Sequence, residues 1–154
     1  MEPMGPDKHL WAMIKQRDPK FLQLICDATD MLVSGDDPVL RILAEQWALA
    51  KPHLEEGALV LTGVGFFYQY QVPEPLRRIP TTRLVLSDLT GYVNGRLVFL
   101  NLFVNDGKLD VLEGATIDEW PEVIEEYTLF FGREPGCPRD LDRLRKYCGP
   151  WPKL

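Results

Sequence analysis

Cysteine and histidine are scarce in this 154-residue sequence, and their spacing excludes the commonest sites that they build. The three cysteines, Cys26, Cys137 and Cys148, form no CxxC pair, and a secreted disulfide scaffold of this size would have more of them. Their spacing leaves open whether Cys137 and Cys148 pair. His9 and His53 lack HxxxH or ExxH spacing, so we expect no metal site and no cofactor.

Long apolar runs are also missing. None reaches the roughly 20 residues that a membrane span requires, and the N-terminal stretch MEPMGPDKHLWAMIKQ lacks a basic region followed by an apolar one. The sequence therefore predicts a cytoplasmic protein in a reducing compartment, with no membrane partner.

Catalytic signatures are absent as well. The stretch TGVGFF, residues 62–67, lacks both GxxxxGK[ST] and the third glycine of GxGxxG, and a strand rather than a helix is predicted to follow it. Neither Ser34 nor Ser87 stands in a GxSxG elbow. These absences favour a protein that is not an enzyme.

Charge is unevenly distributed. The net charge of −6 combines −9 over residues 1–131 with +3 over residues 132–154. Nucleic-acid-binding proteins display a positive footprint, so the acidic body argues against nucleic acid and for a basic protein as partner.

The first fifty residues contain clear signals for helices. Asp18-Pro19 and Asp37-Pro38 each place an N-cap residue before a proline at the first helical position, and they predict helices over about 19–33 and 38–51. An earlier helix is expected over about 7–17. Leu40, Leu43 and Trp47 recur at helical spacing, as expected of a face turned to the core.

From Gly57 the pattern becomes that of strands. The run ALVLTGVGFFYQYQV is too long for one ordinary strand, and its glycines predict a bulge or a close backbone approach that bends it. Asn94-Gly95 and Asn105-Asp106-Gly107 predict two hairpin turns. A last strand is expected at 125–131 and a helix at 138–148.

Together these signals predict an α+β fold in which N-terminal helices pack on an antiparallel β-meander sheet, with a short C-terminal helix. We expect one domain over residues 1–154, with helices in 7–51, the sheet in 57–131, and the C-terminal helix and tail in 132–154.

Two features are candidates for binding. Period-two alternation places Phe66, Tyr68, Tyr70 and Val72 on one sheet face, where tyrosine's polar tip makes Tyr68 and Tyr70 candidates for lining a groove. The second is a run of carboxylates without Lys or Arg, which reads either as a solvated face or as a surface for a basic partner: Asp110, Glu113, Asp118, Glu119, Glu122, Glu125 and Glu126.

The stretches TGVGFFYQYQV and NGRLVFLNLFVNDGKLDVLEGATIDEWPE carry a resemblance over residues 57–122. They resemble a group of small bacterial proteins of unassigned function that share TGxGFF, a DG turn, LEG and a following WP. The resemblance implies a bacterial cytoplasmic origin and an α+β fold, and it implies no catalytic residue.

The hypothesis that best accommodates these patterns is a non-enzymatic protein-binding module, of the immunity type that neutralises a basic bacterial toxin through an acidic surface. The alternative is a small enzyme or ligand-binding domain with a groove near Tyr68, Tyr70 and Glu113. A third possibility is a homo-oligomer in which the apolar LVFLNLFV strand is an edge that pairs with its copy.

Overall fold

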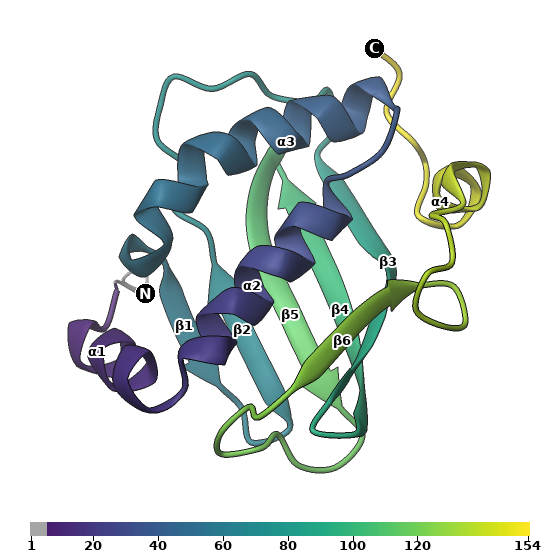
Figure 1. Cartoon of the computed structure of the whole chain (residues 1–154). Coiled ribbons are helices and arrows are strands. Elements are labelled where there is room, and N and C mark those ends of the chain that lie inside the picture. The colour runs from purple at the N-terminus through teal and green to yellow at the C-terminus, as the bar shows by residue number, and fades with distance from the viewer. Residues whose placement is uncertain (1–5) are drawn as a thin grey trace.

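The computed structural model describes residues 6–154, and helices precede strands along the chain, as the sequence predicts (Figure 1). The first three helices, α1 to α3, are followed by a 3₁₀ helix, η1: Lys8–Arg17, Pro19–Leu32, Pro38–Ala50 and Lys51–Glu56. The strands β1 to β6 are Ala58–Leu61, Gly65–Gln69, Arg83–Val93, Arg96–Asn105, Lys108–Thr116 and Tyr127–Phe131. Helix α4, Leu141–Tyr147, comes last.

The starts of two helices differ in what holds them. Asp37 caps α3 as predicted, with its Oδ1 accepting from the backbone nitrogens of Val39 and Leu40 at 2.8 and 3.3 Å. Asp18 makes no side-chain cap on α2; its Oδ1 accepts from the nitrogen of Ile124 at 3.0 Å instead. Asp18 therefore ties the start of α2 to the loop between β5 and β6.

All six strands form one antiparallel sheet in the order β1-β2-β5-β4-β3-β6. The two predicted hairpin turns are confirmed: Asn94 and Gly95 have φ of 49° and 78°, and Asp106 and Gly107 have 53° and 71°. Both pairs lie in the left-handed region that a tight hairpin turn requires. The meander itself consists of β3, β4 and β5.

The prediction of one bent strand over residues 57–72 was wrong. The chain reverses at residues 62–64, and β1 and β2 form an antiparallel hairpin with Leu61 opposite Phe66. Gly63 has φ of 85° in this turn, where glycine is favoured. The predicted close approach does occur, at Gly65: a Cβ there would lie 1.9 Å from the carbonyl oxygen of Gly114 on β5.

The strand LVFLNLFV is not an edge. It belongs to β4, which pairs with β5 on one side and β3 on the other, so the sheet ends at β1 and β6. This placement removes the predicted edge pairing with a second copy. Helix α4 is also shorter than predicted, because Asp140 caps it by accepting from the nitrogen of Arg143 at 3.0 Å.

Helices α2 and α3 cross one face of the sheet and bury it (Figure 1). The core lies between these layers, with Leu24, Leu43 and Leu100 fully buried. The opposite face carries half-buried and exposed side chains, among them Phe67 and Phe99. Within residues 6–154, no helix combines the length and the apolar character that crossing a membrane would require.

Candidate functional site

Tyr68 and Tyr70 are core residues, so the prediction that they line a groove was wrong. Both are almost fully buried, at 0% and 6% exposed. The Tyr68 hydroxyl donates to the carbonyl oxygen of Leu54 at 2.8 Å, and the Tyr70 hydroxyl bonds the Thr29 hydroxyl at 2.7 Å. Burial raises the pKa of both phenols above the ordinary value. Both phenolic groups are therefore satisfied inside the protein.

Glu113 lies on the other face of the sheet from these tyrosines. Across the β2–β5 pairing Tyr68 faces Leu112, whereas Glu113 faces Phe67, and successive residues of a strand point to opposite faces. The Glu113 carboxylate accepts from Asn101 Nδ2 at 2.9 Å. The groove that the alternative function requires is therefore not formed by these residues.

The predicted run of carboxylates is divided between two places. Asp110 and Glu113 belong to β5, and Asp110 accepts from Asn105 Nδ2 at 2.6 Å on the face that the helices leave open. The other five belong to the loop between β5 and β6: Asp118, Glu119, Glu122, Glu125 and Glu126. A single acidic face over residues 110–126 does not exist.

The loop is held mainly through its backbone, which leaves its carboxylates available. Asn94 Nδ2 donates to the carbonyl oxygen of Val123 at 2.8 Å, and Asn94 Oδ1 accepts from the nitrogens of Glu125 and Glu126 at 2.8 and 3.2 Å. Arg96 donates to the carbonyl oxygen of Glu119 at 2.7 Å.

Four of the loop's five carboxylates are exposed and form no ion pair within residues 6–154, the exception being Asp118. Arg96 also pairs with the exposed carboxylate of Asp118 at 3.7 Å. Within the part of the chain that the structure describes, Glu119 and Glu122 are exposed and form no ion pair.

An apolar groove of about 430 Å³ lies beside these carboxylates, between α1, the start of α2, β1 and the loop. Three of its apolar side chains remain substantially exposed, at 41% for Met13, 48% for Leu61 and 44% for Val123. The full lining is Met13, Ile14, Arg17, Asp18, Phe21, Leu61, Trp120, Pro121, Glu122 and Val123. We name this hollow the acidic groove.

Aromatic rings form the inner wall of the acidic groove. The rings of Phe21, Phe66 and Trp120 meet edge to face, with centroids 4.9 to 5.9 Å apart. Trp120 is also fixed through its backbone nitrogen, which donates to the carbonyl oxygen of Gly63 at 2.8 Å. The wall is therefore rigid, while Met13 and Leu61 at the rim are free to contact a partner.

Trp120 has an unmet hydrogen-bonding requirement. Its indole Nε1 is the one buried side-chain nitrogen or oxygen within residues 6–154 that has no hydrogen-bond partner. An indole nitrogen is a donor only, and a buried donor without an acceptor costs about 1–3 kcal/mol.

The short motifs that carry the resemblance meet at this wall. Gly65 and Gly114 approach so closely that no Cβ fits between β2 and β5, and a Cβ on Gly114 would lie 2.3 Å from the ring of Phe66. Phe66 in turn contacts Trp120, the first residue of WP. TGVGFF, LEG and WP therefore form one packed unit.

Sequence reasoning identified the carboxylates but missed the apolar groove. Val64 and Ile117 are 45% and 82% exposed at the same end of the sheet, and Thr116 bonds the carbonyl oxygen of Val64 at 2.8 Å. The signal that was available is their position: Leu61, Val64 and Ile117 are apolar residues that flank turns, where polar residues are usual.

No metal-binding cluster of three or more His, Cys, Asp or Glu occurs within the described residues 6–154. Cys26, Cys137 and Cys148 are free thiols, so the possible pairing of the last two is not formed. Comparison of the chain with protein-family models, with curated proteins and with solved structures gave no match.

Proposed function

We propose that this protein is a non-enzymatic binding module of the immunity type, and that it engages a basic partner protein at the acidic groove. One observation carries the proposal. An open apolar groove, lined by the exposed Met13, Leu61 and Val123, also contains the exposed Glu122, and the exposed Glu119 directly precedes the lining residue Trp120 in the sequence.

The two kinds of residue would contribute differently to binding. Exposed apolar side chains gathered in a groove supply affinity when a partner covers them. Carboxylates at the rim supply selectivity and a faster association with a positively charged surface. Arg17 is the basic member of the groove lining, so the region keeps an excess of negative charge.

The apolar lining and the exposed Glu122 together indicate which partner would fit the groove. The proposed ligand is therefore a segment of a protein that carries an apolar side chain flanked by Lys or Arg.

We also propose that the chain belongs with the small bacterial proteins that share TGxGFF, LEG and WP. The packing of these motifs around Gly65, Gly114 and Trp120 supports this grouping. Residues that contact one another in the fold would be shared together by proteins of the same fold.

The proposal is tested with labelled peptides. Fluorescence anisotropy compares a peptide with Leu flanked by Lys and Arg, the same peptide with Glu in place of the basic residues, and one with Ser in place of Leu. We expect binding of the first peptide alone, and an affinity that falls as salt increases. Equal binding of all three peptides, or of none, contradicts the proposal.

Variants then locate the site. Leu61→Lys and the pair Glu119→Gln with Glu122→Gln should each weaken binding of the basic peptide, the pair by about 3- to 10-fold. The matched control is Glu126→Gln with Glu134→Gln, which removes the same charge from exposed residues that form no ion pair within residues 6–154 and do not line the groove. A control that weakens binding as much as the rim pair would rule out a local site.

A further inference from the structure

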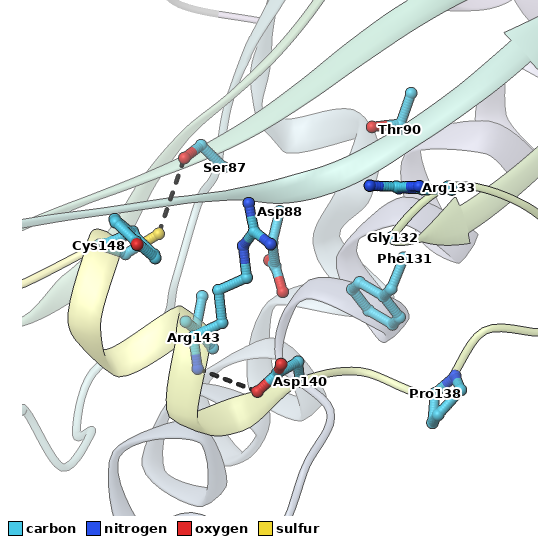
Figure 2. Close-up of a pocket in the computed structure, with 12 residues that line it drawn as sticks. Ser87, Asp88, Thr90, Phe131, Gly132, Arg133, Pro138, Asp140, Arg143 and Cys148 are labelled. Carbon is cyan, nitrogen blue, oxygen red and sulfur yellow. Dashed lines mark hydrogen bonds between the residues drawn. The ribbon is translucent and has the colours of Figure 1, made fainter.

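A second hollow, of about 460 Å³, lies at the other edge of the sheet, between β3, the end of β6 and α4 (Figure 2). Its lining differs in charge from that of the acidic groove. Two arginines, Arg133 and Arg143, line it together with the hydroxyl groups of Ser87 and Thr90. We name it the arginine hollow.

The carboxylate of Asp88 also borders this hollow, but its charge is already matched. Arg139 Nε and Nη2 bind its two oxygens at 2.8 and 2.9 Å. The same guanidinium uses Nη1 to bind the carbonyl oxygens of Met31, Leu32 and Ser34 at 3.1, 2.8 and 2.7 Å. With its side chain 6% exposed, Arg139 is a structural residue that joins β3 to the end of α2.

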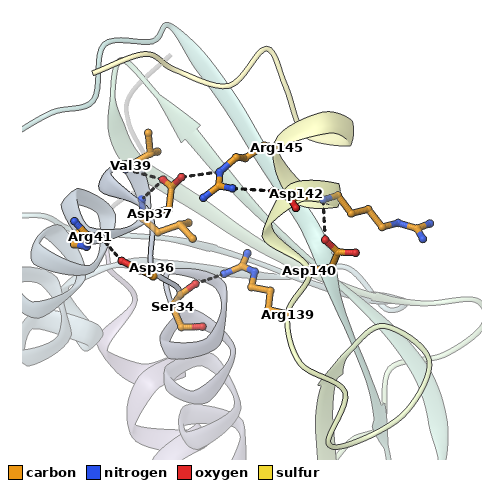
Figure 3. A network of polar contacts seen from close by, with 11 residues as sticks. Ser34, Asp36, Asp37, Val39, Arg41, Arg139, Asp140, Asp142 and Arg145 are labelled. Carbon is orange, nitrogen blue, oxygen red and sulfur yellow. Dashed lines mark hydrogen bonds and ion pairs between the residues drawn. The ribbon is translucent and has the colours of Figure 1, made fainter.

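The neighbouring carboxylates are occupied as well, in the network shown in Figure 3. Asp140 accepts from the backbone nitrogen of Arg143 at the start of α4, 3.0 Å away. Asp37 and Asp142 both pair with Arg145, at 2.9 and 3.3 Å. None of these carboxylates forms an ion pair with a guanidinium of the hollow within residues 6–154.

Arg133 and Arg143 are thus left without an ion-pair partner in residues 6–154, and with Asp140 as the unpaired carboxylate of the lining the hollow keeps a small excess of positive charge. Both are exposed, and within the described residues neither forms an ion pair. In Figure 2 the Arg143 side chain extends from α4 toward β3, and Arg143 also lies over the ring of Tyr147 at 5.5 Å.

The remaining donors suit an oxyanion. Thr90 has no side-chain hydrogen bond within residues 6–154, and the Ser87 hydroxyl contacts only the Cys148 thiol, at 3.6 Å. Guanidinium and hydroxyl groups are the side chains that bind phosphate oxygens most often. Phe131 and Tyr147 also line the hollow; Arg139 lies over the buried ring of Phe131 at 4.7 Å, so the exposed ring of Tyr147 supplies most of the apolar wall.

We infer that the arginine hollow binds a small molecule that carries a phosphate monoester on a flat apolar group. A phosphate monoester offers three acceptor oxygens, which can be shared between two guanidinium groups and two hydroxyls, whereas a carboxylate offers two in one plane. This inference is independent of the proposed function, because the two hollows share no lining residue.

The test uses three probes in isothermal titration and in chemical-shift mapping: inorganic phosphate, phenyl phosphate and benzoate. We expect phenyl phosphate to bind more tightly than inorganic phosphate and benzoate to bind least. Phenyl phosphate should shift the resonances of Ser87, Thr90 and Phe131. Benzoate binding as tightly as phenyl phosphate, or no binding of either phosphate at 10 mM, would overturn the inference.

The arginines are then tested directly. Arg133→Gln combined with Arg143→Gln should weaken phenyl phosphate by at least tenfold, while the melting temperature stays within about 2 °C of the parent, because neither residue forms an ion pair within the fold that is described. Arg83→Gln is the matched control, an exposed arginine on β3 outside the hollow. Unchanged affinity in the double variant, or an equal loss in the control, would overturn the assignment.

Discussion

The acidic groove and the arginine hollow lie at opposite edges of one sheet and are held together by different interactions. The groove is built by apolar packing of Phe21, Phe66 and Trp120, which uses no charged side chain. The hollow is built by hydrogen bonds and ion pairs around Arg139 and Arg145. The type of packing around each hollow therefore determines which charged side chains within residues 6–154 have no ion-pair partner there.

This difference explains which charged side chains of each hollow are left without an ion-pair partner in the described part of the chain. At the groove, apolar walls need no carboxylate, so Glu119 and Glu122 remain at the rim. At the hollow, Asp88 is used by Arg139, and the arginines left over are Arg133 and Arg143. Net charge of the whole chain therefore says little about either site; the local use of counter-charges decides what each can bind.

The largest effect is expected where the groove's packing depends on backbone contact. Gly65→Val would place a branched side chain where even a Cβ lies 1.9 Å from the carbonyl oxygen of Gly114. The strands β2 and β5 would have to separate, and we expect a loss of at least about 3 kcal/mol in the free energy of unfolding, measured by urea denaturation. A variant that unfolds like the parent would contradict this packing.

The control separates steric from conformational cost. Gly63→Ala keeps the same turn but meets nothing within 4 Å, although its φ of +85° disfavours alanine. We expect a loss of about 1–2 kcal/mol from that backbone conformation alone. A loss as large as that of Gly65→Val would assign both effects to turn geometry.

The second-largest effect is expected from removing Arg139, whose hydrogen bonds and ion pair hold the arginine hollow together. Arg139→Leu removes the partner of Asp88 and the donor to three carbonyl oxygens, so we expect a loss of about 2–4 kcal/mol in the free energy of unfolding. Arg143→Leu, on the same hollow, should change that free energy by no more than about 0.5 kcal/mol. Equal losses for the two variants would mean that Arg143 is structural and unavailable to a ligand.

The sequence predicts some parts of the fold better than others, depending on whether a feature is determined by neighbouring residues or by distant ones. Local signals suffice for the Asp37 cap and for the Asn94-Gly95 turn, because each depends on neighbouring residues. The hairpin at residues 62–64 was missed because the apolar run on both sides of it contains no Asn-Gly pair. Its formation depends on the pairing of β2 with β5, far along the chain.

Candidate sites were harder to predict, because they depend on which groups find partners in space. The sequence shows Glu113 and Glu119 as members of one acidic run, but only the fold shows that Glu113 is bonded by Asn101. The basic tail was visible as +3 over residues 132–154, yet nothing local distinguishes the structural Arg139 from the free Arg143. The burial pattern of Tyr68 was predicted correctly; the groove beside it was not.

The smallest effect is expected from replacing one of two aspartates, Asp18 in the acidic groove or Asp88 at the arginine hollow. Asp18 lines the acidic groove, 6% exposed, and forms no ion pair within residues 6–154, whereas Asp88 is bound by Arg139. Burial raises the pKa of Asp18 above its ordinary value of 3.8, against the opposing effect of hydrogen bonds from Ile124 and Phe21. The folded state therefore favours the protonated form of Asp18.

The sign of the pH dependence follows from that shift. Below pH 3.8 the carboxyl is protonated in both states and costs nothing; as pH rises through the folded pKa, the unfolded state loses its proton first and the free energy of unfolding falls. Asp18→Asn keeps an acceptor for the Ile124 nitrogen and removes the charge. We expect a gain in the free energy of unfolding at pH 7 that disappears as pH falls below the ordinary pKa of 3.8.

The same change at the other edge should have the opposite sign. Asp88→Asn leaves Arg139 with one acceptor oxygen in place of two charged ones, so we expect a loss of about 1–2 kcal/mol in the free energy of unfolding at pH 7. Urea denaturation of both variants at pH 7 and pH 3.5 makes the comparison directly. Two losses of equal size at pH 7 would show that Asp18 is stabilised as a carboxylate, and Arg17, the basic residue of the groove lining, would then be the candidate for the positive charge that stabilises it.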